Sequence, residues 1–325
     1  METEEGTGFD CRICGACRTS GTYLAREMMF ALGTAFHYAQ CVGCGSLWLT
    51  DPPADFSVHY PREYYSFGNG SKGARERLTD FLRARRDWSY FGRGGVLGRF
   101  LARQYQEGGL LSISKLNVRR DARILDVGCG SGKLLHRMAA VGFKNLAGVD
   151  PFLSNEISNG NGLRVRKCRL EDVTNEKYDL VMFHHSLEHV ANPKGTLRTA
   201  AQLLAPGGKC LVRLPVVADA WEKYGTGWVQ LDPPRHIWVP TEGAMRILAE
   251  SVGLRVQSVE HDSTGFQFWG SELCRLGLRL ESATPLRLAR QFGLRGLREF
   301  RQRAWVLNRN KRGDQAAFLL ERTEG

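Results

Sequence analysis

The amino-acid sequence predicts an α/β fold in which a doubly wound parallel sheet of seven strands follows a small cysteine-rich module. Three observations support this fold class. An apolar strand at residues 123–127 runs into a turn with three glycines and then into a helix. Further apolar strands alternate with helix-length segments, which is the pattern of a parallel sheet with helical crossovers. Two Cys-x-x-Cys-Gly turns lie near the beginning of the chain.

The cysteine turns come first and predict a metal site. Cys11 and Cys14 form one pair, and Cys41 and Cys44 form the other. Four thiolates at this spacing can converge tetrahedrally on one zinc ion, and a full coordination sphere leaves no position for a catalytic water. A redox-active dithiol and four unrelated cysteines are the alternatives, and Cys17 is expected to be a bystander because no glycine follows it. We therefore predict a structural zinc ribbon over residues 1–50.

The glycine turn predicts a cradle for a nucleotide cofactor. Gly128, Gly130 and Gly132 let the backbone turn tightly and approach a ligand, and Asp126 lies just before them. The following helix, residues 133–140, presents an N-terminus that favours an anionic group. A turn of this kind is shared by several cofactor-binding enzyme classes, and glycine runs also occur in plain turns.

The remaining strands place further polar residues at the edge of the sheet where ligands bind. The second strand, residues 143–149, ends at Asp150, whose carboxylate can accept hydrogen bonds from two ribose hydroxyls. The third strand is followed by Glu171 and Asp172, which suit an adenine amine, although a solvated acidic pair is the alternative. The fourth strand runs into His184 and His185. The expected third, fourth, sixth and seventh strands are residues 163–167, 178–183, 254–261 and 315–322, and residues 203–214 are expected to form a helix end, a Gly-Gly turn and the fifth strand.

These motifs, in this order, resemble those of class I methyltransferases that use S-adenosylmethionine (SAM). The resemblance covers roughly residues 120–262 and rests on six segments. They are Leu125–Gly132, Gly148–Asp150, Leu170–Asp172, Tyr178–Val181, Leu187–Val190 and Leu204–Gly208. A dinucleotide dehydrogenase would be expected to have a wider glycine spacing. The resemblance implies a Rossmann-like sheet and SAM as cofactor. Asp126 and the three glycines would surround its methionine end, Asp150 its ribose and Glu171 or Asp172 its adenine, with His184 also at the site.

A second resemblance concerns the N-terminal part of the chain. The ribbon, followed by residues 48–53 and the aromatic segment 63–66, is similar to the N-terminal module of bacterial methyltransferases from glycan and natural-product pathways. In the related sugar C-methyltransferases, a histidine-containing segment after the fifth strand contributes to acceptor chemistry. Residues 231–240 correspond to that segment and contain His236. The Tyr-His-Glu-His pattern of those enzymes is absent, which favours O-methylation over C-methylation.

Histidines are the candidates for activating the acceptor, because methyl transfer to a hydroxyl requires alignment and loss of a proton. His236, His185 and His184 are the catalytic candidates. His189 is expected to cap or pack locally. A structural loop histidine is the alternative interpretation of His236.

The charge is strongly positive and unevenly distributed. The net charge is +11, yet residues 72–120 and 273–312 together carry 23 basic and 6 acidic side chains. Such segments can bind RNA, anionic lipid or a phosphorylated acceptor, and an arginine-rich solvated surface is the plainer alternative. Residues 286–301 have partial helical amphipathicity, which Gly293 and Gly296 weaken.

These observations predict SAM-dependent methyl transfer to a small-molecule, sugar or lipid-linked glycan acceptor. An rRNA or tRNA methyltransferase and a non-catalytic SAM-fold binding protein are the alternatives. We expect residues 51–120 to form a connector with basic helices, and residues 121–325 to form the SAM domain, with a helical insertion at 263–312. The acidic first residues and the lack of a long apolar run predict a cytoplasmic protein, with peripheral contact at the inner membrane face as a further expectation.

Overall fold

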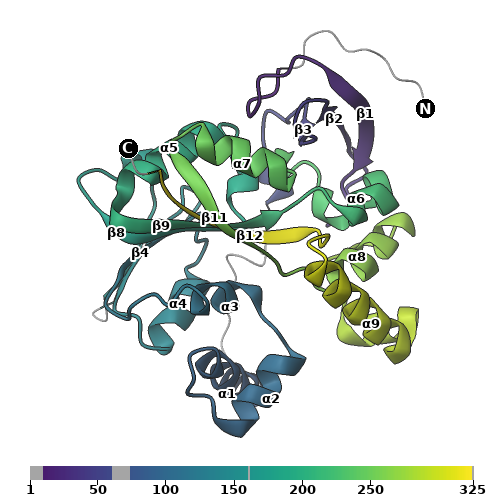
Figure 1. Cartoon of the computed structure of the whole chain (residues 1–325). Coiled ribbons are helices and arrows are strands. Elements are labelled where there is room, and N and C mark those ends of the chain that lie inside the picture. The colour runs from purple at the N-terminus through teal and green to yellow at the C-terminus, as the bar shows by residue number, and fades with distance from the viewer. Residues whose placement is uncertain (1–9, 61–73, 160–161, 324–325) are drawn as a thin grey trace. The chain divides into compact units, whose positions relative to one another are not determined.

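The structure, a computed structural model, describes residues 10–60, 74–159 and 162–323 (Figure 1). Its main feature is an eight-stranded sheet in the order β11-β12-β9-β8-β4-β5-β7-β6. The strands are β4 (Arg123–Val127), β5 (Asn145–Val149), β6 (Ile157–Asn159), β7 (Leu163–Arg166), β8 (Tyr178–His184), β9 (Leu204–Pro215), β11 (Leu254–His261) and β12 (Gln315–Arg322). The predicted α/β class with a doubly wound sheet is confirmed.

The sheet has one strand more than the seven expected. The additional strand, β6, is three residues long and pairs antiparallel with β7. It is too short and too polar to give a strand pattern in the sequence. The last strand, β12, lies between β9 and β11 and pairs antiparallel with β11, so it adjoins both the fifth and the sixth predicted strands.

The chain divides into two compact units. The first, here called the cradle unit, contains residues 61–186 and 199–212, and the second, the ribbon unit, contains residues 1–60, 187–198 and 213–325. In the cradle unit, β4 pairs in parallel with β5 and β8, and β5 pairs in parallel with β7. Ile124 and Leu125 of β4 are fully buried, as expected for a strand covered on both faces.

Ion pairs and a helix cap connect several helices of the cradle unit. The helices of this unit are α1 (Ala74–Ser89), α2 (Gly95–Gln104), α3 (Gly108–Ser114), α4 (Lys133–Ala140) and the short η2 (Leu170–Asp172). Arg137 of α4 forms ion pairs with Asp87 of α1, at 2.8 Å, and with Glu107, at 2.9 Å. The Glu107 side chain also caps the N-terminus of α3 by accepting hydrogen bonds from two backbone N–H groups. These contacts attach the segment before the first parallel strand to the helix that follows it.

The ribbon unit contains a small sheet of its own, in the order β1-β2-β3-β10. Its strands are β1 (Thr19–Arg26), β2 (Ala35–Cys41), β3 (Leu47–Leu49) and β10 (Trp238–Val239). The helices of this unit are α6 (Asp219–Tyr224), α7 (Glu242–Glu250), α8 (Phe266–Arg275) and α9 (Pro285–Arg309), with short turns η1 (Ser57–His59), η3 (Leu187–His189), η4 (Gly225–Gly227) and η5 (Val229–Leu231). Helix α5 (Pro193–Leu203) begins in this unit and ends in the cradle unit.

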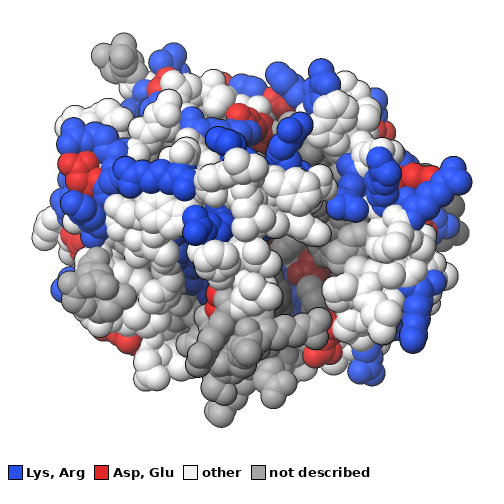
Figure 2. All heavy atoms as spheres, turned by 90° about the horizontal axis from the view of Figure 1, so that it is seen from below, with Lys and Arg blue, Asp and Glu red and all other residues white. Residues whose placement is uncertain are grey.

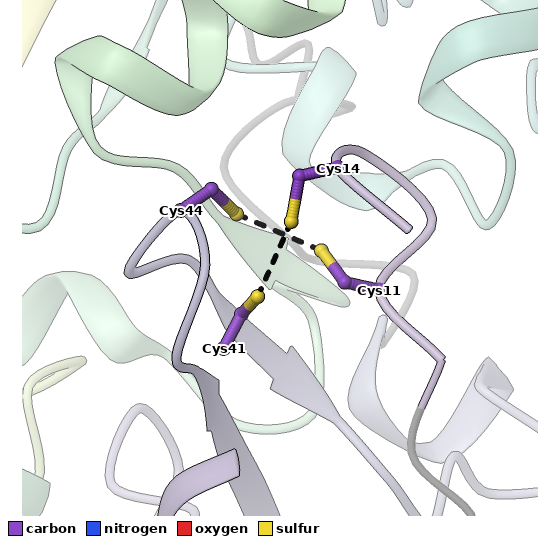
Figure 3. A group of neighbouring side chains, drawn as sticks. All are labelled: Cys11, Cys14, Cys41 and Cys44. Atoms are coloured by element: carbon purple, nitrogen blue, oxygen red, sulfur yellow. Dashed lines mark hydrogen bonds between the residues drawn. The ribbon is translucent and has the colours of Figure 1, made fainter. Parts of the chain in front are cut away.

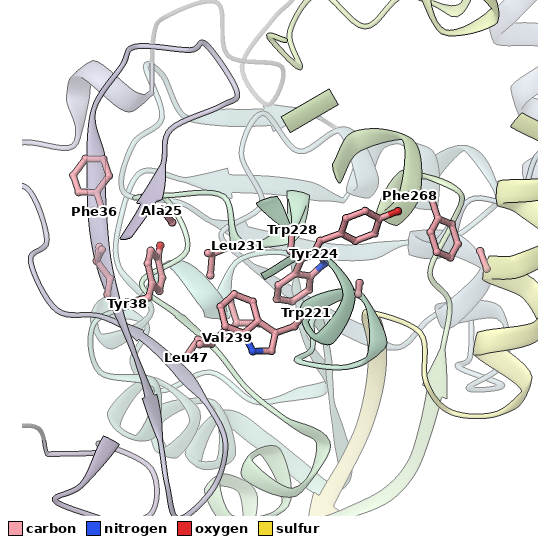
Figure 4. Packing of buried hydrophobic residues seen from close by; sticks show 13 residues of the cluster. Ala25, Phe36, Tyr38, Leu47, Trp221, Tyr224, Trp228, Leu231, Val239 and Phe268 are labelled. Atoms are coloured by element: carbon pink, nitrogen blue, oxygen red, sulfur yellow. The ribbon is translucent and has the colours of Figure 1, made fainter. Parts of the chain in front are cut away.

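An aromatic cluster forms the core of the ribbon unit (Figure 4). Tyr38 of β2 and Trp228 are almost completely buried, and Trp221 packs against Trp228 and Tyr23. The Trp228 indole N–H donates to the buried Asp314 carboxylate at 2.9 Å. The cluster therefore joins residues from both ends of the sequence in one hydrophobic core.

The predicted excursion between the last two strands consists of α8 and α9. Helix α9 is interrupted at Gly293, where φ is +67° and ψ is 162°, so two helical segments meet at a kink. This is the position where the sequence predicted a weakened helix. Across the described residues, the helices are too short or too polar to cross a bilayer.

Candidate functional site

The glycine turn of the cradle unit is held at the ends of β4 and β5. Gly128 has φ +71°, and a Cβ atom there would lie 2.5 Å from Cβ of Ser186, so only glycine fits. The Gly128 N–H donates to the carbonyl of Val149 at 2.8 Å, and the Gly130 N–H donates to Oδ2 of Asp150 at 2.9 Å. The other carboxylate oxygen of Asp150 accepts from the Phe152 N–H at 2.9 Å. Asp150 therefore shapes the turn as well as facing it.

Asp126 brings a second buried carboxyl group to this turn. It is 2% exposed, and within the described residues its Oδ1 has no hydrogen-bond partner. Burial, together with the charge of Asp150, raises the pKa of Asp126 to about 8. A buried carboxyl group without a partner is costly, so it points to a group that binds there. A cationic or hydrogen-bond-donating ligand would suit it.

The other predicted cofactor residues also lie at the carboxyl edge of the parallel strands. Gly132 has φ +70° and begins α4, whose N-terminus it caps. Glu171 and Asp172 lie in η2 after β7 and are both exposed, and Asp172 accepts a hydrogen bond from the Arg169 N–H at 2.9 Å. His184 ends β8 and His185 follows it with φ +52°, and both are half-buried. The topology thus places all of these predicted residues at the ends of neighbouring strands.

The four predicted metal ligands converge in the ribbon unit (Figure 3). The sulfur atoms of Cys11 and Cys44 are 3.6 Å apart, and those of Cys14 and Cys41 are 3.5 Å apart. Tetrahedral coordination at the usual Zn–S bond length requires about 3.8 Å between sulfurs. The four residues therefore fit a zinc ion, whereas the fifth cysteine of this region, Cys17, is exposed and is not a member of the group.

The Cys turns are tied into the fold by backbone hydrogen bonds. The N–H groups of Gly15 and Gly45 donate to the carbonyls of Cys11 and Cys41, at 2.8 and 2.9 Å. The hydroxyl of Thr241 donates to the carbonyl of Cys44 at 2.7 Å and also accepts from the first turn of α7. The second cysteine turn and α7 therefore share a capping residue. The aromatic segment 63–66, which was part of the resemblance to methyltransferases from glycan and natural-product pathways, lies outside the described residues.

The predicted acceptor loop, residues 231–240, is built around a buried arginine. Arg235 has no exposed surface. Its guanidinium contacts Glu27 at 3.0 Å and both carboxylate oxygens of Asp232 at 2.5 and 2.9 Å, and it donates to the carbonyl of His59 at 3.3 Å. Burial acts to raise the pKa of Asp232, but Arg235 outweighs it, so this pKa lies below its usual value. The loop is thus fixed by a charged cluster.

His236 follows this arginine and lies beside His189. The Nδ1 atom of His236 is 2.7 Å from the carbonyl of Gln230, and Nδ1 of His189 is 2.7 Å from the carbonyl of Arg235. Carbonyls only accept, so both Nδ1 atoms carry a proton, and in a neutral ring Nε2 would then hold the lone pair. Burial lowers the pKa of His189, which favours the neutral ring. The two ring centroids are 4.9 Å apart.

Two buried acids of the ribbon unit did not emerge from the sequence. Glu188 has no exposed surface, and its Oε1 is 3.9 Å from Nε2 of His236. Its only signal was its place in the Leu-Glu-His-Val motif, which the sequence analysis used for family resemblance alone. Glu27 is 1% exposed and gave no signal, because its partner Arg235 is 208 positions away in the chain. His189, expected to pack locally, hydrogen bonds to a residue far along the chain.

Comparison with known proteins places this architecture among methyltransferases. Residues 97–259, half of the chain, match the family model described as a methyltransferase domain. The ubiquinone biosynthesis O-methyltransferase of Caulobacter sp. strain K31 is 32% identical over 132 residues, which cover 36% of this chain and 52% of the relative. The corresponding enzyme of Aeromonas salmonicida strain A449 is 28% identical over 165 residues, covering 48% of this chain and 60% of the relative. The chain spans about half the length of the first of these curated relatives.

Two solved structures illustrate the similarity of the chain to known folds. The cyclopropane synthase MmaA2 from Mycobacterium tuberculosis has a TM-score of 0.43 and 15% identity, covering 68% of this chain and 87% of that chain. The magnesium protoporphyrin IX methyltransferase from Synechocystis PCC 6803, solved with bound SAH, has a TM-score of 0.39 and 17% identity, covering 64% and 90%.

The charged cluster around Arg235 yields a prediction about stability. Glu27→Gln removes the charge of Glu27 and leaves the buried guanidinium partly uncompensated, so we expect the free energy of unfolding to fall by about 3 kcal/mol. Urea denaturation followed by circular dichroism measures this change. The matched control is Glu299→Gln, which breaks an exposed ion pair with Arg295 and should cost less than about 1 kcal/mol. Equal losses in the two variants would contradict the assignment.

Proposed function

The chain belongs to the family of methyltransferase domains, and on this premise we propose that it transfers a methyl group from SAM to an oxygen of a small-molecule acceptor. The observation that carries the proposal is the cradle at the ends of β4 and β5, where the Gly130 N–H donates to Asp150 and Oδ1 of the buried Asp126 has no hydrogen-bond partner within the described residues. The names of the curated relatives support an oxygen as the methylated atom.

The residues of the cradle fit the parts of SAM. When bound, SAM supplies an electrophilic methyl group on a sulfonium. Asp126 would hold its cationic amine, and the N–H groups at the start of α4 would face its carboxylate. Asp150 retains lone pairs for ribose hydroxyls beyond those used by Gly130 and Phe152. Glu171 or Asp172 would accept from the adenine amine.

Proton release on cofactor binding tests the role of Asp126. With a pKa of about 8, this carboxyl group is mostly protonated at pH 7 before the cofactor binds. A cationic amine stabilises the ionised form, so binding at pH 7 should release a proton, and the affinity should rise with pH until about pH 8. Titration calorimetry at pH 7 in two buffers of different ionisation enthalpy gives the proton count.

The matched variant is Asp126→Asn, which preserves the shape of the side chain and cannot ionise. We expect this variant to bind SAM more weakly and to release no proton from this site. If wild type and variant release the same number of protons, Asp126 does not contact the amine.

His236 is the histidine whose geometry best suits activation of an acceptor hydroxyl. Its Nδ1–H is fixed by the carbonyl of Gln230, so Nε2 presents its lone pair. Asp232 and Glu188 each place a carboxylate oxygen 3.9 Å from Nε2. His184 and His185, at the end of β8, are the alternative candidates.

A methyl-transfer assay tests both the reaction and this assignment. Labelled SAM is incubated with the protein and with separate phenolic, sugar, lipid-linked glycan and RNA fractions. We expect label in a hydroxyl-bearing small molecule, and His236→Ala should lower turnover at least about a hundredfold, which is typical for loss of an acid–base group, while SAM affinity stays the same. Label in RNA would replace the proposal with the RNA alternative, and no transfer to any fraction would favour a binding protein.

We also propose that the four clustered cysteines hold a structural zinc ion. The support is the convergence of four sulfur atoms at distances close to those of a tetrahedral site. With four thiolate ligands, such an ion would stabilise the fold of the ribbon unit without activating water.

Metal analysis of the purified protein tests the zinc site. The Cys11→Ser, Cys44→Ser double variant should lose the sulfur-bound ion and unfold at a lower temperature than wild type. Cys17→Ser is the control, because this exposed cysteine lies outside the cluster, and it should retain the ion. A folded wild-type protein without any thiolate-bound metal would contradict the site.

We further propose that the protein works in the cytoplasm and contacts the anionic inner membrane face through α9. Leu286 and Leu294 of this helix are 63% and 79% exposed, and Trp305 is 57% exposed, among many exposed arginines. A helix that exposes apolar side chains among arginines suits the interface of an anionic bilayer. Figure 2 shows one face of the molecule on which lysine and arginine side chains are widely spread. Binding of this kind weakens as the salt concentration rises.

A further inference from the structure

Three side chains of the ribbon unit bring electron-rich atoms together. Glu188 and His189 belong to η3, and His236 follows the buried arginine of the 231–240 loop. One ligand atom from each, a carboxylate oxygen or a ring nitrogen, lies within 4.8 Å of the other two. A backbone hydrogen bond holds the two segments together, because the Ile237 N–H donates to the carbonyl of Glu188 at 2.9 Å.

Hydrogen bonds from the Nδ1 atoms set the orientation of both imidazole rings. Nδ1 of His236 donates to the carbonyl of Gln230, and Nδ1 of His189 donates to the carbonyl of Arg235, with the hydroxyl of Tyr60 3.2 Å from the same atom. A histidine that binds a metal almost always donates its other ring N–H to a carbonyl or a carboxylate. This bond fixes both the tautomer and the direction of the metal-binding lone pair. Both rings therefore have the arrangement found in metal sites.

The chemistry of the three side chains indicates which kind of ion they would bind. In their neutral, metal-binding form the two imidazoles and the carboxylate together carry a charge of −1, and Glu188 has no exposed surface. A cation among the three groups would be attracted by the carboxylate and by a ring nitrogen of each histidine. Imidazole with carboxylate suits first-row transition ions better than Mg²⁺ or Ca²⁺, which prefer oxygen ligands.

We propose that Glu188, His189 and His236 bind a divalent first-row transition metal ion, separate from the ion at the four cysteines. Two histidines and one carboxylate leave open positions on such an ion. Its use rests on the proposed function: an acceptor hydroxyl at an open position would have a lowered pKa, so its proton would pass to solvent before the oxygen takes the methyl group and the S–CH₃ bond electrons remain on sulfur. His236 would then activate the acceptor by holding the ion.

Cobalt binding tests this site without any need for activity. The full-length protein, purified with zinc on its cysteines, is titrated with Co²⁺ in the absence of SAM. We expect one Co²⁺ per chain, with weak visible absorption of a nitrogen and oxygen site and without the intense near-ultraviolet absorption of cobalt thiolates. Cobalt that appears only with thiolate absorption, or no uptake beyond the zinc already present, would overturn the proposal.

Variants identify the ligands. His236→Gln and His189→Gln should each weaken cobalt binding at least about tenfold, as loss of groups around a metal typically does. His37→Gln is the matched control, because His37 is exposed and pairs with Asp51, and it should leave binding unchanged. Unchanged binding in both ligand variants would overturn the assignment. If a variant fails to fold, the stoichiometry and spectrum of the unaltered protein still decide the question.

The outcomes for the metal and for the methyl transfer are separable. Cobalt uptake at this site without methyl transfer would support the metal site and contradict the proposed function. Methyl transfer that persists in a strong chelator, together with absent cobalt uptake, would support the proposed function with His236 as a proton acceptor and overturn the metal site.

Discussion

The ribbon unit depends on the ion pairs that the buried guanidinium of Arg235 forms with Glu27 and Asp232. Taking a charge out of water is unfavourable unless its partners compensate it, and here Glu27 and Asp232 do so with short contacts. Glu27 follows the first hairpin strand, and Asp232 and Arg235 come from a loop more than 200 positions later. One buried charge therefore helps to fix the loop that carries His236, and the contacts of His236 with Gln230 and His189 complete its placement.

The cradle unit also contains a buried ionisable group, but there protonation rather than an ion pair removes the charge. Asp126 is a buried carboxyl group whose pKa is raised, so below that pKa it avoids an uncompensated buried charge by keeping its proton. Asp150, a short distance away, uses its oxygens to accept from backbone N–H groups and holds the glycine turn. Asp150 thus stabilises the turn through hydrogen bonds, and its charge makes ionisation of Asp126 less favourable.

The sequence predicted the elements with local signals. The seven strands, the glycine turn, the four clustered cysteines and the weak point of the helix at Gly293 each depend on residue types within a short segment, and each lies at or near its expected position. The exception is the start of β9, which covers residues 204–208, where a helix end and a Gly-Gly turn were expected. Strand β6 could not be predicted because three residues are too few to show periodicity. The roles of Glu27 and Glu188 could not be predicted because their partners are distant in the chain. The role of a buried polar residue cannot be read from its own segment when its partner lies far away in the chain.

Strand β10 is only two residues long, and its pairing has a consequence for modularity. Trp238 and Val239 pair with Trp48 and Leu47 of β3, directly after the second cysteine turn. Two residues cannot persist as a strand without that neighbour. A shortened chain that began after the cysteine module would lose this edge along with Glu27, so the loop of His236 would lose both its strand partner and its counter-charge. The cysteine module and the loop therefore depend on each other, and replacing either one with a foreign segment would require a matching change in the other.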